Sequence, residues 1–278
     1  ASSRNGGIAV PISASLRSVI SLPTKNRDDL ASMVPIEARK YIPVPVSEVA
    51  LDWFVIPEEE ARFISGNAEE RKNGTDVLLV AIHNQHILRN QAILAGAGVT
   101  AKFFEVEPFS MGRASYEHGT APVMIIDFGA SSTRVYIVEF GIISISHTIP
   151  RGGQDITLSW AKSKSMTFAE AEAEKRVHGI ENNEVGKSIV EYVFSEARRI
   201  FLSYQRKENK AVSKVVLLGG GALLKGLPEL SKQYFDAPII LGAPFDRVSA
   251  PAFISEVLKF AGPSFASAIG LALRALQR

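Results

Sequence analysis

Apolar and polar residues change their spacing along the chain, and each change predicts a boundary between elements. Three short apolar runs near the start have the length and alternation of strands, at residues 8–12, 16–22 and 49–56. Residues 28–41 have a helical composition, with Asn26 as the expected cap and Pro35 expected to kink or split the helix. Residues 57–75 are charged, carry Gly and Asn, and have no apolar period, which predicts an exposed loop.

From residue 77 onward, strand-like and helix-like segments follow one another regularly. The expected strands are residues 77–82, 99–106, two within 123–139, 142–149, 215–218 and 238–241. The expected helices are residues 84–94 with Asn84 as cap, 109–117, two or three within 167–207, 227–235 and 264–276. Strands separated by helices predict an α/β layer architecture.

The stretch VMIIDFGASSTRVYIVE, residues 123–139, predicts a β-hairpin whose tip carries only small and hydroxyl residues. The tip consists of Gly129, Ala130, Ser131, Ser132 and Thr133, and we expect Gly129 to allow a left-handed turn. Exposed backbone N–H groups beside hydroxyls favour an anion such as phosphate. Asp127 would repel phosphate unless a divalent cation, Mg²⁺ with its waters, lies between them. The alternative from this stretch alone is an ordinary hairpin with a polar turn.

A second turn without side chains, Gly219, Gly220, Gly221 and Ala222, follows the apolar run 215–218. Open α/β sheets bind ligands at such strand ends. The spacing of the glycines excludes a dinucleotide fingerprint, and Glu181 stands where a Walker A loop before Gly186 would need glycine. A lone triple glycine is more often a tight turn than a ligand site, so the two turns together are the stronger indication.

Two further groups are candidates for function. Glu107 follows a strand and precedes Pro108 at the start of a helix, where it orients water or is simply an acid favoured by the helix dipole. Glu196, Arg199 and Ser203 share one face of a predicted helix, and by themselves indicate a solvated stripe.

Composition narrows the possible functions. The chain of 278 residues has a net charge of +2 and no basic block, which argues against a nucleic-acid partner. It contains no cysteine, so disulfides and thiolate chemistry are excluded. No apolar run approaches the roughly 20 residues of a membrane span, and the chain lacks a signal-peptide pattern at its start. We therefore expect a soluble and, if bacterial, cytoplasmic protein.

The order of these motifs resembles that of the actin, Hsp70 and sugar-kinase superfamily, and most of all the PilM family of type IV pilus assembly proteins, relatives of the division protein FtsA. The segments that carry the likeness are EARKYIPVP (37–45), EVALDW (48–53), VEPF (106–109), the Asp127 hairpin, IPRGG (149–153), the triple glycine and FASAIG (265–270).

The resemblance implies an actin-like fold of two α/β lobes with a small inserted subdomain of the 1C type. The implied domains are a first lobe of residues 1–20, 83–122 and 262–278, an insert of 21–82, a second lobe of 123–162 and 211–261, and a helical subdomain of 163–210. The two glycine turns would converge across a cleft between the lobes and hold one triphosphate through a metal.

The resemblance also implies roles for residues and a partner. Asp127 would hold Mg²⁺ through water, Glu107 would orient water or metal, and residues 129–133 would cradle the β- and γ-phosphates of ATP or ADP. The triple glycine and Ala222 would flank the α-phosphate and adenosine, and the 196–203 stripe would bound the adenine and ribose. The partner would be the cytoplasmic N-terminal tail of PilN, at the inner-membrane platform that also communicates with motor ATPases.

One motif of the superfamily, an Asp-x-Gly loop expected before residue 8, has no match in the chain, so we expect at most slow ATP hydrolysis. An FtsA-type C-terminal membrane helix has no match either, which favours PilM over an FtsA-like division protein. Two other functions remain as alternatives: a peptide-binding adaptor without nucleotide, similar to the type II secretion protein GspL, and a small-molecule kinase, for which we find no catalytic base.

Overall fold

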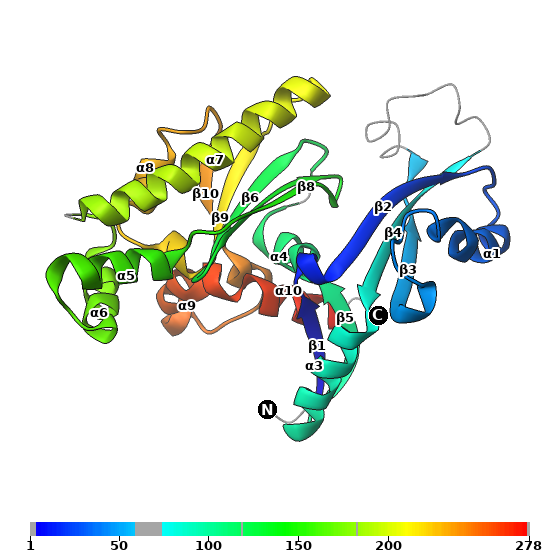
Figure 1. Ribbon diagram of the computed structural model, residues 1–278, viewed down its shortest axis with the longest axis horizontal. Coiled ribbons are helices and arrows are strands. Elements are labelled where there is room, and N and C mark those ends of the chain that lie inside the picture. The colour runs from blue at the N-terminus through cyan, green and yellow to red at the C-terminus, as the bar shows by residue number, and fades with distance from the viewer. Residues whose placement is uncertain (1–3, 59–73, 118, 182, 277–278) are drawn as a thin grey trace. The chain divides into compact units, whose positions relative to one another are not determined.

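The computed structural model describes residues 4–58, 74–117, 119–181 and 183–276. Contacts within the chain divide it into two compact units, Ala1–Glu107 and Pro108–Arg278 (Figure 1). Each unit has its own sheets and its own core, so each is described by itself.

The first unit contains two sheets. In the larger one β4 (Thr75–His83) lies between β2 (Ser15–Leu22) and β3 (Val49–Val55), and all pairs are antiparallel. The helix α1 (Arg27–Ala38) packs on this sheet through Leu30 and Val34, which join Ile20, Val77 and Leu79 in one apolar core. This sheet and helix therefore form a small structure with its own core between residues 15 and 83.

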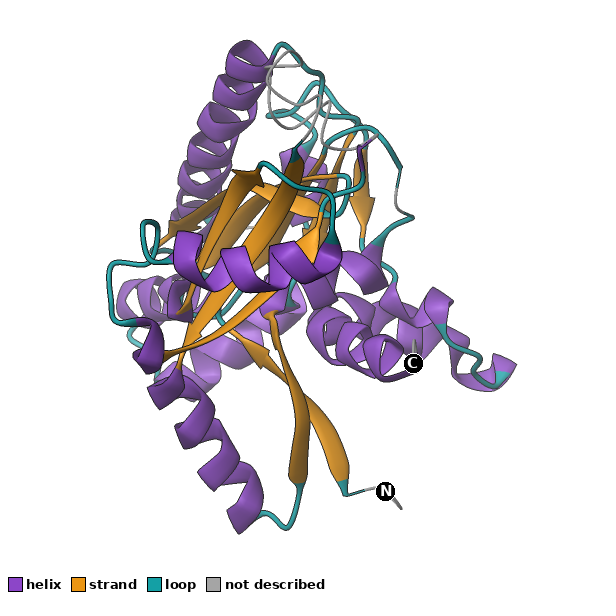
Figure 2. Cartoon of the chain, turned by 90° about the vertical axis from the view of Figure 1, so that its right-hand side faces the viewer, coloured by secondary structure: helices purple, strands orange, loops and turns teal. Residues whose placement is uncertain are grey.

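The smaller sheet of the first unit pairs β1 (Asn5–Val10) in parallel with β5 (Thr100–Val106) (Figure 2). The helix α3 (Asn84–Gly96) connects β4 to β5 and contacts β5. Glu107, the last residue of the first unit, begins α4 (Glu107–Ser115).

The second unit contains a five-stranded sheet in the order β10-β9-β6-β7-β8. Its strands are β6 (Val123–Phe128), β7 (Thr133–Glu139), β8 (Ile142–Ile149), β9 (Lys214–Leu218) and β10 (Ile239–Leu241). Besides α4, the helices of this unit are α5 (Gly153–Lys164), α6 (Phe168–His178), α7 (Glu184–Glu208), α8 (Leu227–Ser231), α9 (Ser255–Ala261) and α10 (Ala266–Leu276). The long helix α7 lies along one face of the sheet (Figure 1). Its buried residues, Val190 and Phe194 among them, pack with Ile126 of β6 and Leu217 of β9.

The central strands are largely apolar because both of their faces are buried. All six residues of β6 are buried, whereas β8 at the sheet edge is buried at its two ends and half-buried or exposed between them. A continuous apolar run is typical of a strand covered on both faces. This pattern gave the correct strands from the sequence alone.

Several expectations about local structure are confirmed and several are wrong. The side chain of Asn26 caps α1 by accepting a hydrogen bond from the N–H of Asp28 at 2.8 Å, as predicted. Asn84, in contrast, is the first residue of α3 and not its cap, and its amide donates to the carbonyl of Ser47. The helix α1 is not split at Pro35. The expected loop at 57–75 lies mostly outside the described residues.

Two helices of the second unit were not predicted. The helix α5 begins at Gly153, between the expected strand 142–149 and the expected helices within 167–207, and α9 lies between the expected strand 238–241 and the expected helix 264–276. Gly152 precedes α5 in an extended conformation, so the glycines mark the start of this helix. Our boundaries for two lobes and two subdomains stay a prediction.

Candidate functional site

The two glycine turns lie next to each other because their strands are neighbours. The strands β6 and β9 pair in parallel, with Asp127 opposite Leu218, so both chains leave the sheet at the same edge. Gly129 and Ala130 after β6, and Gly220 and Gly221 after β9, line one pocket of about 520 Å³ in the second unit. Pockets for small organic ligands have volumes of this order. The turns therefore meet within one sheet, not from opposite sides of a cleft as we expected.

The hairpin turn is closed tightly and held by the start of α5. The N–H of Gly129 donates to the carbonyl of Ser132 at 3.1 Å, and a Cβ on Gly129 would lie 2.8 Å from that same oxygen. Gly129 does not have a positive φ, so our explanation of this glycine was wrong and close approach is the reason for it. The N–H groups of Gly153 and Gln154 donate to the carbonyls of Gly129 and Ala130 at 2.9 and 2.8 Å.

Gly219 begins the second turn and needs to be glycine for two reasons. Its φ is +81°, in the left-handed region that favours glycine. A Cβ at this position would lie 2.5 Å from the carbonyl oxygen of Phe128 and 2.6 Å from Oδ1 of Asp127. The carboxylate of Asp127 therefore lies against the backbone of the glycine turn.

The helix α6 also lines the pocket, and its buried lysine, Lys175, connects α6 to α5. Lys175 of α6 is only 7% exposed, and its Nζ donates to the carbonyl of Gly153 at 3.0 Å, to Oγ1 of Thr157 at 2.9 Å and to Oε2 of Glu172 at 2.6 Å. An ammonium group has three donors, and these contacts use all of them. Lys175 therefore fixes the start of α5, which in turn holds the hairpin turn.

Glu172 is the carboxylate of this cluster. It accepts hydrogen bonds from Lys175, from Oγ1 of Thr157 at 2.6 Å and from Nε of Arg176 at 3.0 Å. Burial by itself raises the pKa of Glu172, but the hydrogen bonds from these three groups outweigh burial and hold the pKa at about 2. The cluster therefore keeps fixed charges of both signs at the pocket wall.

Asp127 is paired with Arg134 across the hairpin. The two residues are directly opposite in the β6–β7 register, and Nη1 of Arg134 lies 3.3 Å from Oδ2 of Asp127. Asp127 is 7% exposed. The carboxylate that we expected to hold a metal thus faces a guanidinium group.

Asp127 and the predicted residues of the two turns divide into three groups. Four of them line the pocket, namely Gly129, Ala130, Gly220 and Gly221, and Gly219 and Asp127 adjoin it. Ser131 is exposed and Ser132 half-buried in the hairpin turn, and neither lines the pocket. Thr133 and Ala222 are wholly buried, and the hydroxyl of Thr133 donates to the carbonyl of Arg151.

The stripe on α7 does not reach this pocket. Glu196 and Arg199 form an ion pair of 2.6 Å with the arginine side chain 71% exposed, and Ser203 is exposed as well. None of these three residues lines the pocket. The stripe is therefore solvated, as its spacing alone indicated, and the role that the resemblance implied for it at the adenine and ribose stays a prediction.

Sequence reasoning missed the residues that complete the pocket. These are Gly153, Glu172, Lys175, Arg176, Leu223, Leu224, Phe260 and Ser264. The one available signal was the sequence EAEKR at 172–176, which places two carboxylates and two cations within five consecutive residues of a helix. In a charged helix, this sequence pattern cannot be distinguished from that of an ordinary solvent-exposed face.

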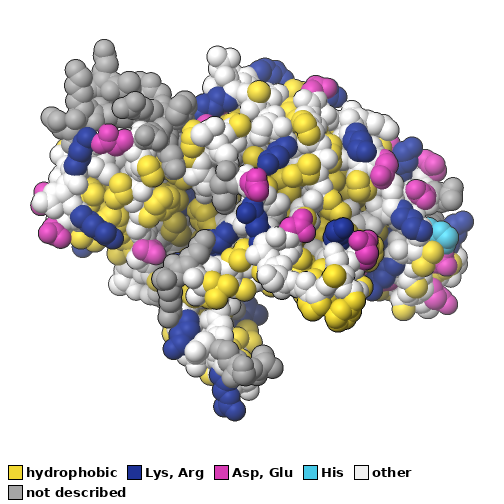
Figure 3. All heavy atoms as spheres, turned by 180° about the vertical axis from the view of Figure 1, so that it is seen from behind, with side chains coloured by type: hydrophobic (Ala, Val, Ile, Leu, Met, Phe, Trp, Pro, Cys, Tyr) yellow, Lys and Arg dark blue, Asp and Glu magenta, His cyan; other side chains and the backbone are white. Residues whose placement is uncertain are grey.

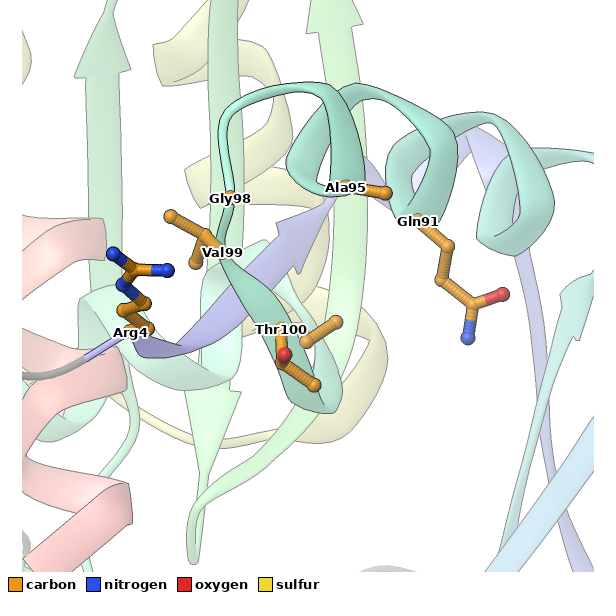
Figure 4. Close-up of a pocket in the computed structure, with 7 residues that line it drawn as sticks. Arg4, Gln91, Ala95, Gly98, Val99 and Thr100 are labelled. Carbon is orange, nitrogen blue, oxygen red and sulfur yellow. The ribbon is translucent and has the colours of Figure 1, made fainter.

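The surface has two other features that bear on function. A hollow of about 480 Å³ in the first unit lies beside the end of α3, and Arg4 is the one charged residue that lines it among the described residues (Figure 4). Figure 3 shows basic and acidic side chains interspersed over one face of the chain. That face offers no continuous basic stripe of the kind that follows a nucleic-acid backbone.

Comparison with known proteins decides the family. The family profile described as "Type IV pilus assembly protein PilM" matches residues 1–276. The chain belongs to the PilM family. Its function therefore lies in type IV pilus assembly. None of the helices in the described part of the chain is long and apolar enough to cross a membrane.

PilM-family membership agrees with the fold. The structure of a PilM-PilN type IV pilus biogenesis complex is similar, with a TM-score of 0.77, 25% identity, and coverage of 98% of this chain and 80% of that one. The ethanolamine utilization protein EutJ of Carboxydothermus hydrogenoformans shares the fold over 66% of this chain and 59% of its own, with a TM-score of 0.51 and 22% identity. The cell division protein FtsA of Borreliella burgdorferi is 26% identical over 92% of this chain and 70% of its own length. The fold is actin-like, as expected.

Proposed function

We propose that this PilM-family chain binds an adenine nucleotide, ATP or ADP, in the pocket between the two glycine turns and α6. The observation that carries the proposal is that the two glycine turns and the turn of α6 with Glu172, Lys175 and Arg176 all line one pocket. Bare backbone allows a phosphate chain to approach closely, and fixed cations compensate its charge. The volume of about 520 Å³ suits a mononucleotide.

The pocket residues provide different surfaces for different parts of the ligand. Gly129, Ala130, Gly220 and Gly221 offer the backbone against which phosphates would lie. Leu223, Leu224 and Phe260 form an apolar wall suited to a base. Arg176, whose side chain is 76% exposed, is the cation at the rim, and Lys175 keeps the frame rigid from behind.

We also propose a partner. One similar solved structure is that of a PilM-PilN complex. We infer that this chain binds the cytoplasmic N-terminal tail of PilN and acts as a scaffold at the inner-membrane platform, with nucleotide changing its affinity for the tail. Differential affinity for the partner in two states is what such a switch requires. The role of Glu107 in orienting water or metal stays a prediction, as does contact with motor ATPases.

Calorimetric titration with ATP and with ADP tests the nucleotide proposal. The variant Gly220→Ala should fold normally, since its new Cβ would be 3.6 Å from the nearest side chain, Oγ of Ser264. The methyl group would enter the pocket wall and weaken ATP binding by about tenfold, a cost of about 1.4 kcal/mol. Gly96→Ala is the control, because its Cβ meets nothing within 4 Å and Gly96 lies in the first unit.

The result that contradicts the proposal is the absence of binding heat at millimolar nucleotide in the unmodified chain. Titration of a synthetic PilN tail, with and without ATP, tests the partner separately. A tail that binds in the absence of any nucleotide effect would support the adaptor alternative.

A further inference from the structure

The metal expected at Asp127 does not fit the structure. A water-mediated Mg²⁺ site needs an unneutralised carboxylate that faces the phosphates. Here the carboxylate of Asp127 is 3.3 Å from Nη1 of Arg134, its cross-strand partner. Among the described residues, no group of three or more His, Asp or Glu side chains could hold a metal ion. A guanidinium group at this position places one positive charge where a second cation would be repelled.

The ion pair lies beside the pocket. Oδ1 of Asp127 is 2.6 Å from the position of a Cβ on Gly219, and the next two residues, Gly220 and Gly221, line the pocket. The side chain of Arg134 is 29% exposed, whereas that of Asp127 is 10% exposed. The arginine is therefore the member of the pair that is more open to solvent, and it adjoins the pocket through Asp127 without lining it.

Arginine is suited to replace a metal in this position. Its guanidinium keeps its charge at every pH at which the protein is folded, and its planar donors match phosphate oxygens. Unlike a hydrated ion, it is already held in the protein before the ligand arrives. Because it neutralises Asp127, it also removes the charge that would otherwise repel phosphate.

We propose that Arg134 takes the place of the divalent cation, so that the pocket binds ATP as the free polyphosphate anion without needing Mg²⁺. This inference rests on the proposed nucleotide function and specifies the ionic form of the ligand. It makes Arg134 a specificity-determining residue and reverses the role that we first expected for Asp127.

The experiment is a calorimetric titration of the whole chain with ATP in EDTA and with ATP in excess Mg²⁺. In the unmodified chain the two dissociation constants should agree within about threefold. Arg134→Gln should weaken binding of free ATP by about tenfold, the loss expected for one charge-assisted contact of about 1.4 kcal/mol. Arg134→Lys keeps the charge and should restore most of the affinity.

The two members of the ion pair should behave in opposite ways. Asp127→Asn removes the charge that offsets Arg134, so it should strengthen binding of free ATP by about threefold. A metal role for Asp127 predicts instead that this variant loses affinity in Mg²⁺. Arg206→Gln, at an exposed position near the end of α7, is the control for losing one arginine. Thermal unfolding of every variant checks that the fold is retained.

The outcomes separate this inference from the function on which it rests. Absence of binding in both EDTA and Mg²⁺ would overturn the nucleotide proposal itself. Binding that requires Mg²⁺ in the unmodified chain would overturn the role of Arg134 alone. If Arg134→Gln does not fold, the comparison of EDTA with Mg²⁺ in the unmodified chain and the Arg134→Lys variant still decide the question.

Discussion

Replacing Lys175 by methionine should loosen the frame of the pocket. Methionine has a similar length and fills similar space, but it donates no hydrogen bond. The three contacts of Nζ, to Gly153, Thr157 and Glu172, would be lost together. The start of α5 would then keep the hydrogen bond from Thr157 to Glu172 of α6 but lose the contacts of the lysine, and the hairpin turn depends on that start for two hydrogen bonds.

The magnitude follows from the contacts. A hydrogen bond to a charged group contributes about 1.5–3 kcal/mol, and breaking a buried ion pair costs about 3–5 kcal/mol. Two terms reduce the loss: the buried ammonium no longer has to be desolvated, and Glu172 keeps Thr157 and Arg176 as partners with its side chain 26% exposed. We expect Lys175→Met to lower the free energy of unfolding by about 2–3 kcal/mol.

Urea unfolding followed by tryptophan fluorescence measures this loss, since Trp160 of α5 is 6% exposed in the same unit. Hydrogen exchange of residues 150–160 gives the local effect, and amides in this segment should exchange faster. Lys162→Met, at an exposed position on α5, is the matched control and should change the unfolding free energy by less than about 0.5 kcal/mol. If the two variants are equally stable, the account of Lys175 as the tie between α6 and α5 is wrong.

Three other predictions follow from the site. The pKa of Glu172 is lowered to about 2, so its ionised form stabilises the fold fully above the ordinary pKa of Glu, and this stability is lost as the pH falls toward 2. In acid unfolding, the difference in unfolding free energy between the unmodified chain and Glu172→Gln should therefore shrink by about 1–2 kcal/mol between pH 5 and pH 3. Gly219→Ala should lower the free energy of unfolding by more than about 3 kcal/mol, whereas Gly141→Ala, with positive φ but open space, should lower it by about 1–2 kcal/mol; equal losses would mean that the close approach to Asp127 and Phe128 is unimportant. Arg199→Gln should leave the ATP dissociation constant within about twofold, and a tenfold increase would place the adenine against α7 after all.

The strands and glycine turns were predictable because their signals are local. The buried run of β6 and the small residues after it identify a strand and a bare turn without any knowledge of distant segments. The order of the motifs added the fold, since the resemblance to the PilM family covers the whole chain. What these signals could not give was the adjacency of β6 and β9, which is a pairing over a long separation.

Sequence reasoning missed residues whose roles arise only from contacts that form in the folded chain. In the sequence, Lys175 is one of several charged residues of the polar helix α6, and it gains its role only when α6 packs on the start of α5. Arg134 was an unremarked strand residue, and only the hairpin register places it opposite Asp127. The stripe at 196–203 shows the opposite case, in which the spacing on one helix face correctly predicted a solvated ion pair.

A crystal structure of this chain with a non-hydrolysable ATP analogue tests the central claim most directly. The account predicts electron density for phosphates beside the backbone of Gly129 and Gly220, with the base against the wall that contains Phe260 and with α6 at its edge. Density for the nucleotide elsewhere, with packed side chains or solvent alone between the two glycine turns, would contradict it.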